Sequence, residues 1–213
     1  MRILFVLTAL VVSASSGLSI GQSPDKQAPV PIFDGKSFNG WEGNRAIFRI
    51  EQGAIVGGSL REKIARNEFL CTTRTYGDFE LRLKVRLLGE DAANAGVQFR
   101  TRRIPDNHEV IGYQADLGQG YWGSLYDESR RKKTLQSPDA AKIKGVKVGE
   151  WYDYVIRAEG PRIRLWLNGV QTVDYTEEDP SVDTTGVIAV QIHSGPPTEA
   201  WYKDITLLDL TKK

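Results

Sequence analysis

The sequence predicts an all-β protein, with two antiparallel sheets packed as a sandwich or jelly roll. Hydrophobic and polar residues alternate along many short segments, turn-forming dipeptides separate these segments, and the chain contains 21 glycines. The strand-like segments recur at a spacing of roughly ten residues, which is typical of sandwiches and barrels. Helical periodicity is almost absent, which argues against a helical bundle or an α/β fold.

The alternation is clearest in residues 79–87, where hydrophobic side chains occupy the odd positions and charged side chains the even ones. Residues 97–100 and 162–168 repeat the pattern. A strand with one buried face and one solvated face has this period of two, because successive side chains point to opposite faces of the sheet. We therefore expect strands in all three segments.

Two dipeptides predict tight hairpin turns between strands. Asn168-Gly169 and Gln52-Gly53 each lie between strand-like runs, and Asn-Gly in particular takes the positive φ angles of a type I′ turn. The only helical candidate is residues 139–144, which are too few for more than a short turn.

The start of the chain has the pattern of a signal peptide. Met1-Arg2 precedes the apolar run 3–12, and small residues follow; the run is too short to span a bilayer. The alternative, a buried N-terminal helix, is disfavoured because the run has no polar face. We expect residues 1–22 to hold this peptide and the start of the mature chain, and the protein to be exported to the periplasm or beyond the cell.

A proline-punctuated linker is predicted over residues 23–32, followed by one domain over residues 33–210. No later segment is long and apolar enough to predict a membrane span. The net charge of +1, from 28 basic and 27 acidic residues, gives no field that would attract nucleic acid. Cys71 is the single cysteine, so no disulfide forms within the chain and we expect this thiol to be buried. The oligomeric state is left open.

Two rows of polar side chains follow the predicted strands. In one, Glu80 alternates with hydrophobic residues, and in the other, Gln98 and Arg100 do so. Such rows are typical of a solvated sheet exterior, but on a curved sheet they would line a trough suited to sugar hydroxyls. The pattern alone does not distinguish these two interpretations.

Residues 112–127 combine aromatic, acidic and glycine residues more densely than any other segment. Sugars are bound by this mixture, because their C–H faces stack on aromatic rings while carboxylates and amides bind the hydroxyls. Trp122 is expected to be exposed at a loop tip. For Tyr113 a place in the core and a place in a sugar site are equally consistent with the sequence.

His193 ends a strand-like run, directly before Ser194-Gly195-Pro196-Pro197. A histidine at a strand end beside a rigid loop is well placed as a general base or metal ligand. The alternative is a structural histidine bonded to a loop carbonyl. His108 lies in a polar loop and is expected to be solvated.

Common catalytic signatures are absent, including the Gly-x-Ser-x-Gly elbow, the P-loop, His-Glu-x-x-His and Cys-x-x-Cys. The Glu-x-Asp-x-Glu strand of laminarinase-type glucanases is absent too. Hydrolysis by a closely spaced carboxylate pair therefore has no support in the sequence.

An ordered set of segments resembles the 3-keto-disaccharide hydrolase family. These segments are Ile32-Phe33-Asp34-Gly35-Lys36, Gly40-Trp41, Gly77-Asp78-Phe79-Glu80-Leu81, Asn94-Ala95-Gly96-Val97-Gln98-Phe99-Arg100, Gly112-Tyr113-Gln114-Ala115-Asp116, Gly123-Ser124-Leu125-Tyr126-Asp127, Leu167-Asn168-Gly169 and Gln191-Ile192-His193-Ser194-Gly195. The resemblance implies a concanavalin-like (lectin-like) jelly roll, export from the cytoplasm and a keto-sugar substrate such as a 3-keto-glycoside or 3-keto-disaccharide.

A chemical hypothesis follows from that substrate. A ketone at C3 acidifies the C2 proton, so a base can remove it, the C1 substituent leaves by elimination, and water then adds to the enone. We expect His193 or Asp116 to act as the base and Glu80 or Asp127 as the acid or a metal ligand. Substrate-binding roles are expected for Gln114, Tyr113, Trp122, Tyr126 and Asp127, with Arg100 and Gln98 as anchors for the enolate and the hydroxyls.

No cofactor is required by this hypothesis, although a divalent cation held by His193 and carboxylates could replace arginine as the electrophile. The competing interpretation is a non-catalytic carbohydrate-binding module that uses the same trough. Such a module would bind unoxidised glycans without forming a product.

Overall fold

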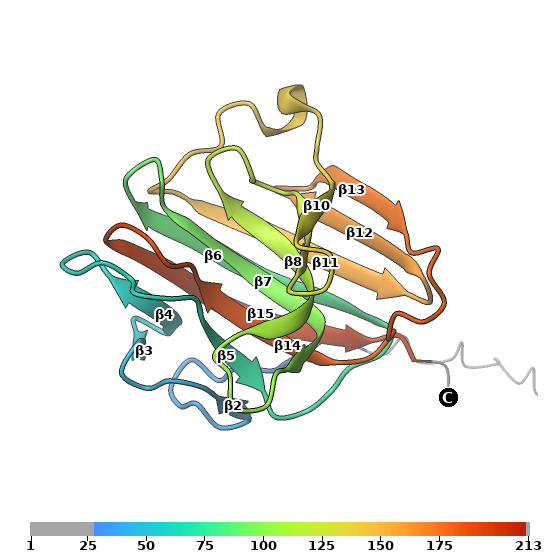
Figure 1. Cartoon of the computed structure of the whole chain (residues 1–213), viewed down its shortest axis with the longest axis horizontal. Coiled ribbons are helices and arrows are strands. Elements are labelled where there is room, and N and C mark those ends of the chain that lie inside the picture. The colour runs from blue at the N-terminus through green and yellow to red at the C-terminus, as the bar shows by residue number, and fades with distance from the viewer. Residues whose placement is uncertain (1–27, 212–213) are drawn as a thin grey trace, which may run out of the picture.

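The computed structural model describes residues 28–211, which fold as two antiparallel β-sheets packed face to face (Figure 1). The predicted signal peptide and the first half of the predicted linker lie outside the described residues. The last part of that linker forms a short strand, because Val30 and Pro31 pair with Leu207 and Thr206. The prediction of an all-β sandwich is confirmed.

The larger sheet has eight strands in the order β13-β12-β11-β6-β15-β4-β3, with β1 paired to β15. Its strands are β1 (Val30–Pro31), β3 (Phe48–Glu51), β4 (Ala54–Ser59), β6 (Phe79–Gly89), β11 (Trp151–Glu159), β12 (Arg162–Leu167), β13 (Val170–Thr176) and β15 (Thr198–Asp209).

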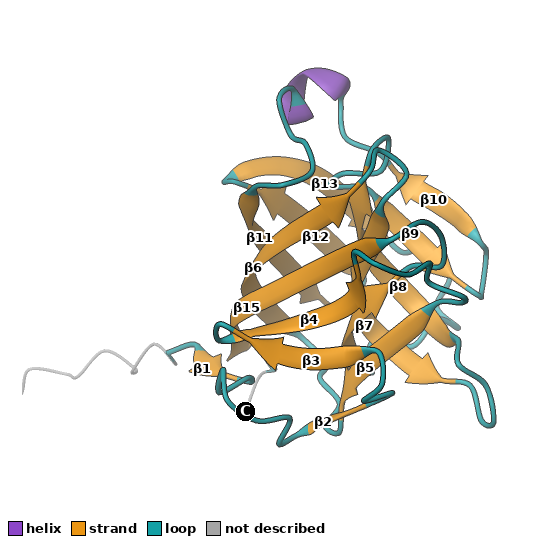
Figure 2. Ribbon diagram, turned by 90° about the vertical axis from the view of Figure 1, so that its left-hand side faces the viewer, coloured by secondary structure: helices purple, strands orange, loops and turns teal. Residues whose placement is uncertain are grey.

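The smaller sheet has seven strands in the order β10-β9-β8-β7-β14-β5-β2. Its strands are β2 (Trp41–Glu42), β5 (Glu68–Thr72), β7 (Asn94–Arg103), β8 (Val110–Gly118), β9 (Leu125–Glu128), β10 (Lys133–Gln136) and β14 (Val187–Ile192). A 3-10 turn, η1 (Ala140–Ile143), lies in the connection between the two sheets (Figure 2). No helix among the described residues is long and apolar enough to span a bilayer.

The alternation read from the sequence decides which side chains enter the core. Along β6 the side chains of Phe79, Leu81, Leu83, Val85 and Leu87 are buried between the sheets. The predicted hairpin turns form as well, since Gln52, Gly53, Asn168 and Gly169 all have positive φ. Aromatic contacts then link the sheets, with Phe79 of β6 edge-on to Phe99 of β7.

The two polar rows lie on different sheets. Glu80 is on β6 of the eight-stranded sheet, and Gln98 is on β7 of the seven-stranded sheet. Because the inner faces of both sheets pack together, the two rows face outward on opposite sides of the sandwich. Of the two interpretations, the one in which both rows line one trough is therefore wrong.

A β-bulge interrupts the second row. The register of β7 against β8 shifts between Phe99 and Arg102, and Arg100 has a φ of 46°. This backbone geometry ends the alternation. The Arg100 guanidinium turns to Asp78 and to the Gly160 carbonyl, at 2.9 and 2.6 Å.

Candidate functional site

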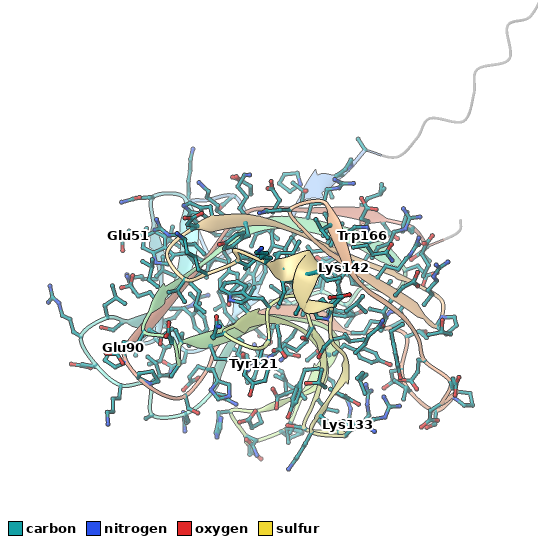
Figure 3. The ribbon with its side chains drawn as sticks, turned by 90° about the horizontal axis from the view of Figure 1, so that it is seen from above. Glu51, Glu90, Tyr121, Lys133, Lys142 and Trp166 are labelled. Atoms are coloured by element: carbon teal, nitrogen blue, oxygen red, sulfur yellow. The ribbon has the colours of Figure 1, made fainter. Side chains whose placement is uncertain are left out.

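A polar hollow of about 320 Å³ opens above the outer face of the seven-stranded sheet. Four of the predicted site residues line it: Gln114, Asp116, Tyr126 and His193. They are joined there by residues that sequence analysis did not select, among them Asn94, Tyr121, Glu128 and Ser194. Figure 3 shows Tyr121 on the side of the seven-stranded sheet, with Trp166 of β12 on the other.

Strand pairing places these side chains on one face. Gln114 of β8 lies opposite both Gln98 of β7 and Tyr126 of β9, and Asp116 follows two positions later on the same face. Gln98, fully buried, donates from its amide to Gln114, and Gln114 donates in turn to Asp116. This chain holds the Asp116 carboxyl in place beneath the hollow.

The carboxyl groups of the hollow are held in a weakly solvated environment. Burial raises the pKa of Asp116 to about 8, against the opposing effect of the Gln114 hydrogen bond. Burial also raises the pKa of Glu128 to about 7, and the nearby negative charge of Glu109 adds to this effect. At neutral pH the site therefore contains a protonated Asp116 that can donate a proton, as general acids do.

His193 lies at the rim, directly after the end of β14. Its backbone N–H donates to Asn94 at 3.3 Å, and its Nδ1 lies 2.6 Å from the Ser194 carbonyl oxygen. A carbonyl oxygen only accepts, so a proton on Nδ1 satisfies this contact and leaves the lone pair of Nε2 free. The half-buried imidazole can then take up a proton from a ligand in the hollow.

Three residues expected at the sugar face the interior instead. Trp122 is 2% exposed and packs edge-on against Tyr152, so its expected exposure is wrong. Tyr113 and Asp127 are register partners on β8 and β9, and both point to the opposite face from Gln114 and Tyr126. Tyr113 stacks on Phe99 in the core.

Asp127 instead anchors a basic segment. Its buried carboxylate pairs with Arg130 at 2.9 Å and with Arg131 at 3.1 Å, and Arg131 also pairs with Glu177 at 2.8 Å. These charges are neutralised within the protein. Asp127 is therefore not positioned to act on a ligand in the hollow.

Glu80 and Arg100 also lie away from the hollow. The Glu80 carboxylate is on the outer face of the other sheet, between Arg82 and Arg157. The Arg100 side chain is 2% exposed and pairs with Asp78. Neither residue can take the role of acid or enolate anchor that the sequence led us to expect at this site.

Glu128 is the main residue that sequence analysis missed. It lies two positions after Tyr126 on β9, so the alternation that places Tyr126 in the hollow places Glu128 on the same face. That signal was present in the sequence. Tyr121, by contrast, reaches the hollow from a loop whose path depends on the tertiary structure.

The donor set of the hollow does not fit the divalent cation considered above. Within residues 28–211, His, Cys, Asp and Glu side chains form no group of three or more that could hold a metal ion. We therefore derive no step through a metal.

Comparison with protein families agrees with the order of motifs in the sequence. Residues 28–208 match the model of the 3-keto-alpha-glucoside-1,2-lyase-like domain. The chain belongs to this family. The matched residues include every strand of the sandwich except the last residue of β15. Membership of this 3-keto-alpha-glucoside-1,2-lyase-like family connects the protein with carbohydrate chemistry. A search of the curated proteins finds no significant match.

Solved structures share the fold of this 3-keto-alpha-glucoside-1,2-lyase-like domain at low sequence identity. A Parabacteroides distasonis protein provisionally named a glycosyl hydrolase is 19% identical, with a TM-score of 0.64 over 85% of this chain and 94% of that one. The carbohydrate binding module CBM66 of Bacillus subtilis is 15% identical, with a TM-score of 0.62 over 79% and 94%. A B. subtilis protein with a galectin-like fold is 10% identical, with a TM-score of 0.59 over 79% and 89%. These likenesses describe the architecture alone.

Proposed function

We propose that the protein cleaves 3-keto-glycosides by elimination followed by hydration, outside the cytoplasm. The observation that carries this proposal is the meeting of a buried carboxyl group, Asp116, and a free imidazole, His193, in one sugar-sized hollow. Family membership supports the same chemistry, because a 1,2-lyase of a 3-keto-glucoside performs the elimination step.

In this proposal His193 is the base. Nε2 removes the proton from C2, which the C3 ketone acidifies, and the electron pair forms the C1–C2 double bond as the C1–O bond breaks. Asp116, protonated at neutral pH, donates its proton to the leaving oxygen. Water then adds to C1 and a proton returns to C2, so the sum of the two steps is hydrolysis.

The remaining side chains of the hollow hold the sugar. The amide of Asn94 and the hydroxyls of Tyr121 and Tyr126 supply hydrogen-bond donors for the ketone oxygen as it becomes an enolate. Burial raises the pKa of Tyr126, so its hydroxyl stays a donor at neutral pH. The tyrosine rings also offer faces on which a sugar ring can stack. Glu128 is placed to bind hydroxyl groups.

The test is turnover of a 3-keto-glucoside by purified variants. We expect His193→Ala and Asp116→Asn to lower kcat by at least about 100-fold, as loss of a general base or acid does. His108→Ala is the matched control, since the side chain of His108 contacts the Asn67 carbonyl at 3.0 Å and does not line the hollow. A substrate that carries deuterium at C2 of the sugar should be turned over more slowly by the wild type, because the proposed first step breaks this C–H bond. Wild-type rates in both site variants would end this assignment, and binding of unoxidised glycans without turnover would favour a carbohydrate-binding module.

A further inference from the structure

A second hollow, of about 600 Å³, adjoins the first on the same side of the sandwich. Ala92 and Ser194 line both hollows, so the two spaces meet across these residues. Ser194 directly follows His193 in the chain. A ligand whose reacting bond lies at His193 would therefore extend toward this second space.

The lining of the second hollow differs in chemistry from that of the first. Its other residues are Lys63, Ile64, Ala65, Gly195 and Pro196, so no carboxylate or amide side chain faces it. Sugar hydroxyls need such groups, because a hydroxyl that loses its water partners without replacement is strongly disfavoured. The surface instead matches a small apolar group, with one ammonium at its edge.

The floor of the second hollow is held rigidly. Ile64 and Gly195 exchange backbone hydrogen bonds of 3.0 and 2.9 Å, and the Ile64 side chain is buried in the main core. The Ser194 N–H donates to the Asn67 side chain at 3.0 Å. Because these contacts join the β4–β5 connection to the segment that follows β14, the surface is formed before a ligand binds. Ala65 and Lys63 stay exposed at its edge.

We propose that the second hollow is the leaving-group subsite and that it takes an aglycone with a flat apolar ring, an inference that rests on the proposed function. The ketosugar occupies the polar hollow and its C1 oxygen lies near the shared residues. The ring of the aglycone lies against Ala65 and Pro196. The Lys63 ammonium can approach the face of an aromatic ring, an attractive arrangement of a cation and a π system.

The experiment compares benzyl and methyl 3-keto-glucosides. Benzyl alcohol and methanol are similarly acidic, so a difference between the two substrates reports binding rather than leaving-group reactivity. We expect wild-type kcat/KM, and the affinity for the protein measured by calorimetry, to favour the benzyl compound by about tenfold, as burial of an aromatic ring predicts.

Variants at position 65 localise the effect. Ala65→Asp should abolish the benzyl preference, so that the ratio of kcat/KM for the benzyl and methyl compounds falls to about one, whereas Ala65→Ser should retain the preference. Equal affinities of the wild type for both compounds would overturn the proposed subsite. An equal loss of kcat/KM for both compounds in Ala65→Asp would overturn it too. A benzyl preference in calorimetry without turnover of either compound would support the subsite and contradict the proposed catalysis.

Discussion

The side chain of Gln114 lies directly across the backbone of Gly96 on the neighbouring strand. A Cβ added at Gly96 would come within 2.5 Å of the Gln114 Cδ, closer than packed carbon atoms approach. Gly96 is also the register partner of Asp116. The absence of a side chain at position 96 thus allows Gln114 to reach and bind the Asp116 carboxyl.

Replacement of this glycine should disturb the carboxyl without unfolding the protein. We expect Gly96→Ala to displace Gln114 and to raise the pKa of Asp116 further, because its hydrogen bond to Gln114 is what lowers that pKa. A pH–rate profile of the variant should show the alkaline decline at higher pH. Gly77→Ala is the control, since a Cβ there meets nothing closer than 3.6 Å. An unshifted profile in Gly96→Ala would contradict this account of Gln114.

The raised pKa of Asp116 also predicts how folding stability depends on pH. Folding moves this pKa from its ordinary value of 3.8 to about 8, so between these values the native state keeps a proton that the unfolded state releases. The free energy of unfolding therefore falls as pH rises through this window, by at most ~1.4 kcal/mol per pH unit for this group. Glu128, with a pKa raised to about 7, also makes the free energy of unfolding fall as pH rises.

Urea unfolding of the wild type and of Asp116→Asn at pH 5 and pH 8 measures this contribution. The variant should gain stability relative to the wild type at pH 8, because an amide has no proton to lose. A constant difference between the two proteins at both pH values would show that Asp116 titrates normally. In activity, kcat/KM of the wild type should fall above about pH 8.

Trp122 and Tyr121 are adjacent in sequence but should respond to substitution in opposite ways. Trp122 is 2% exposed and Tyr121 is 49% exposed. Trp122→Ala should lower the free energy of unfolding by roughly 3–5 kcal/mol, because it opens a large cavity in the core. Tyr121→Ala should change stability by less than about 0.5 kcal/mol while raising the KM for a 3-keto-glucoside. Chemical denaturation and steady-state kinetics measure the two effects, and a reversed pattern would contradict the placement of both rings.

Arg100 should support the fold and not the reaction. Its guanidinium binds Asp78 and two backbone carbonyls. We expect Arg100→Met to lower the free energy of unfolding by roughly 2–3 kcal/mol. The loss should be smaller than for an ion pair with both partners fully buried, because the Asp78 side chain is 36% exposed. The kcat of the folded fraction should stay unchanged. A large loss of kcat with unchanged stability would restore Arg100 as a substrate anchor.

Part of the site could be predicted from local pattern alone. Asp116, Gln114, Tyr126 and His193 were selected from the sequence and line one hollow in the structure, and Glu128 could have been added from the same alternation. Tyr113 and Glu80 were misplaced for a common reason, whereas Arg100 follows the bulge in β7 and Trp122 lies in a turn outside the strand alternation. A period of two divides the residues of a strand between two faces, but it does not say which face packs inside or which sheet receives the strand.

The sequence by itself determined the strands, the hairpin turns and the family, because alternation and turn chemistry are local properties of the chain. Only the tertiary structure decided that Glu80 and Gln98 face opposite sides, that a bulge turns Arg100 away from the sheet face, and that His193, Asn94 and Asp116 line one hollow. These outcomes depend on strand pairs far apart in sequence, such as β14 with β7. Such pairings are selected by the burial of the whole core and not by any one segment.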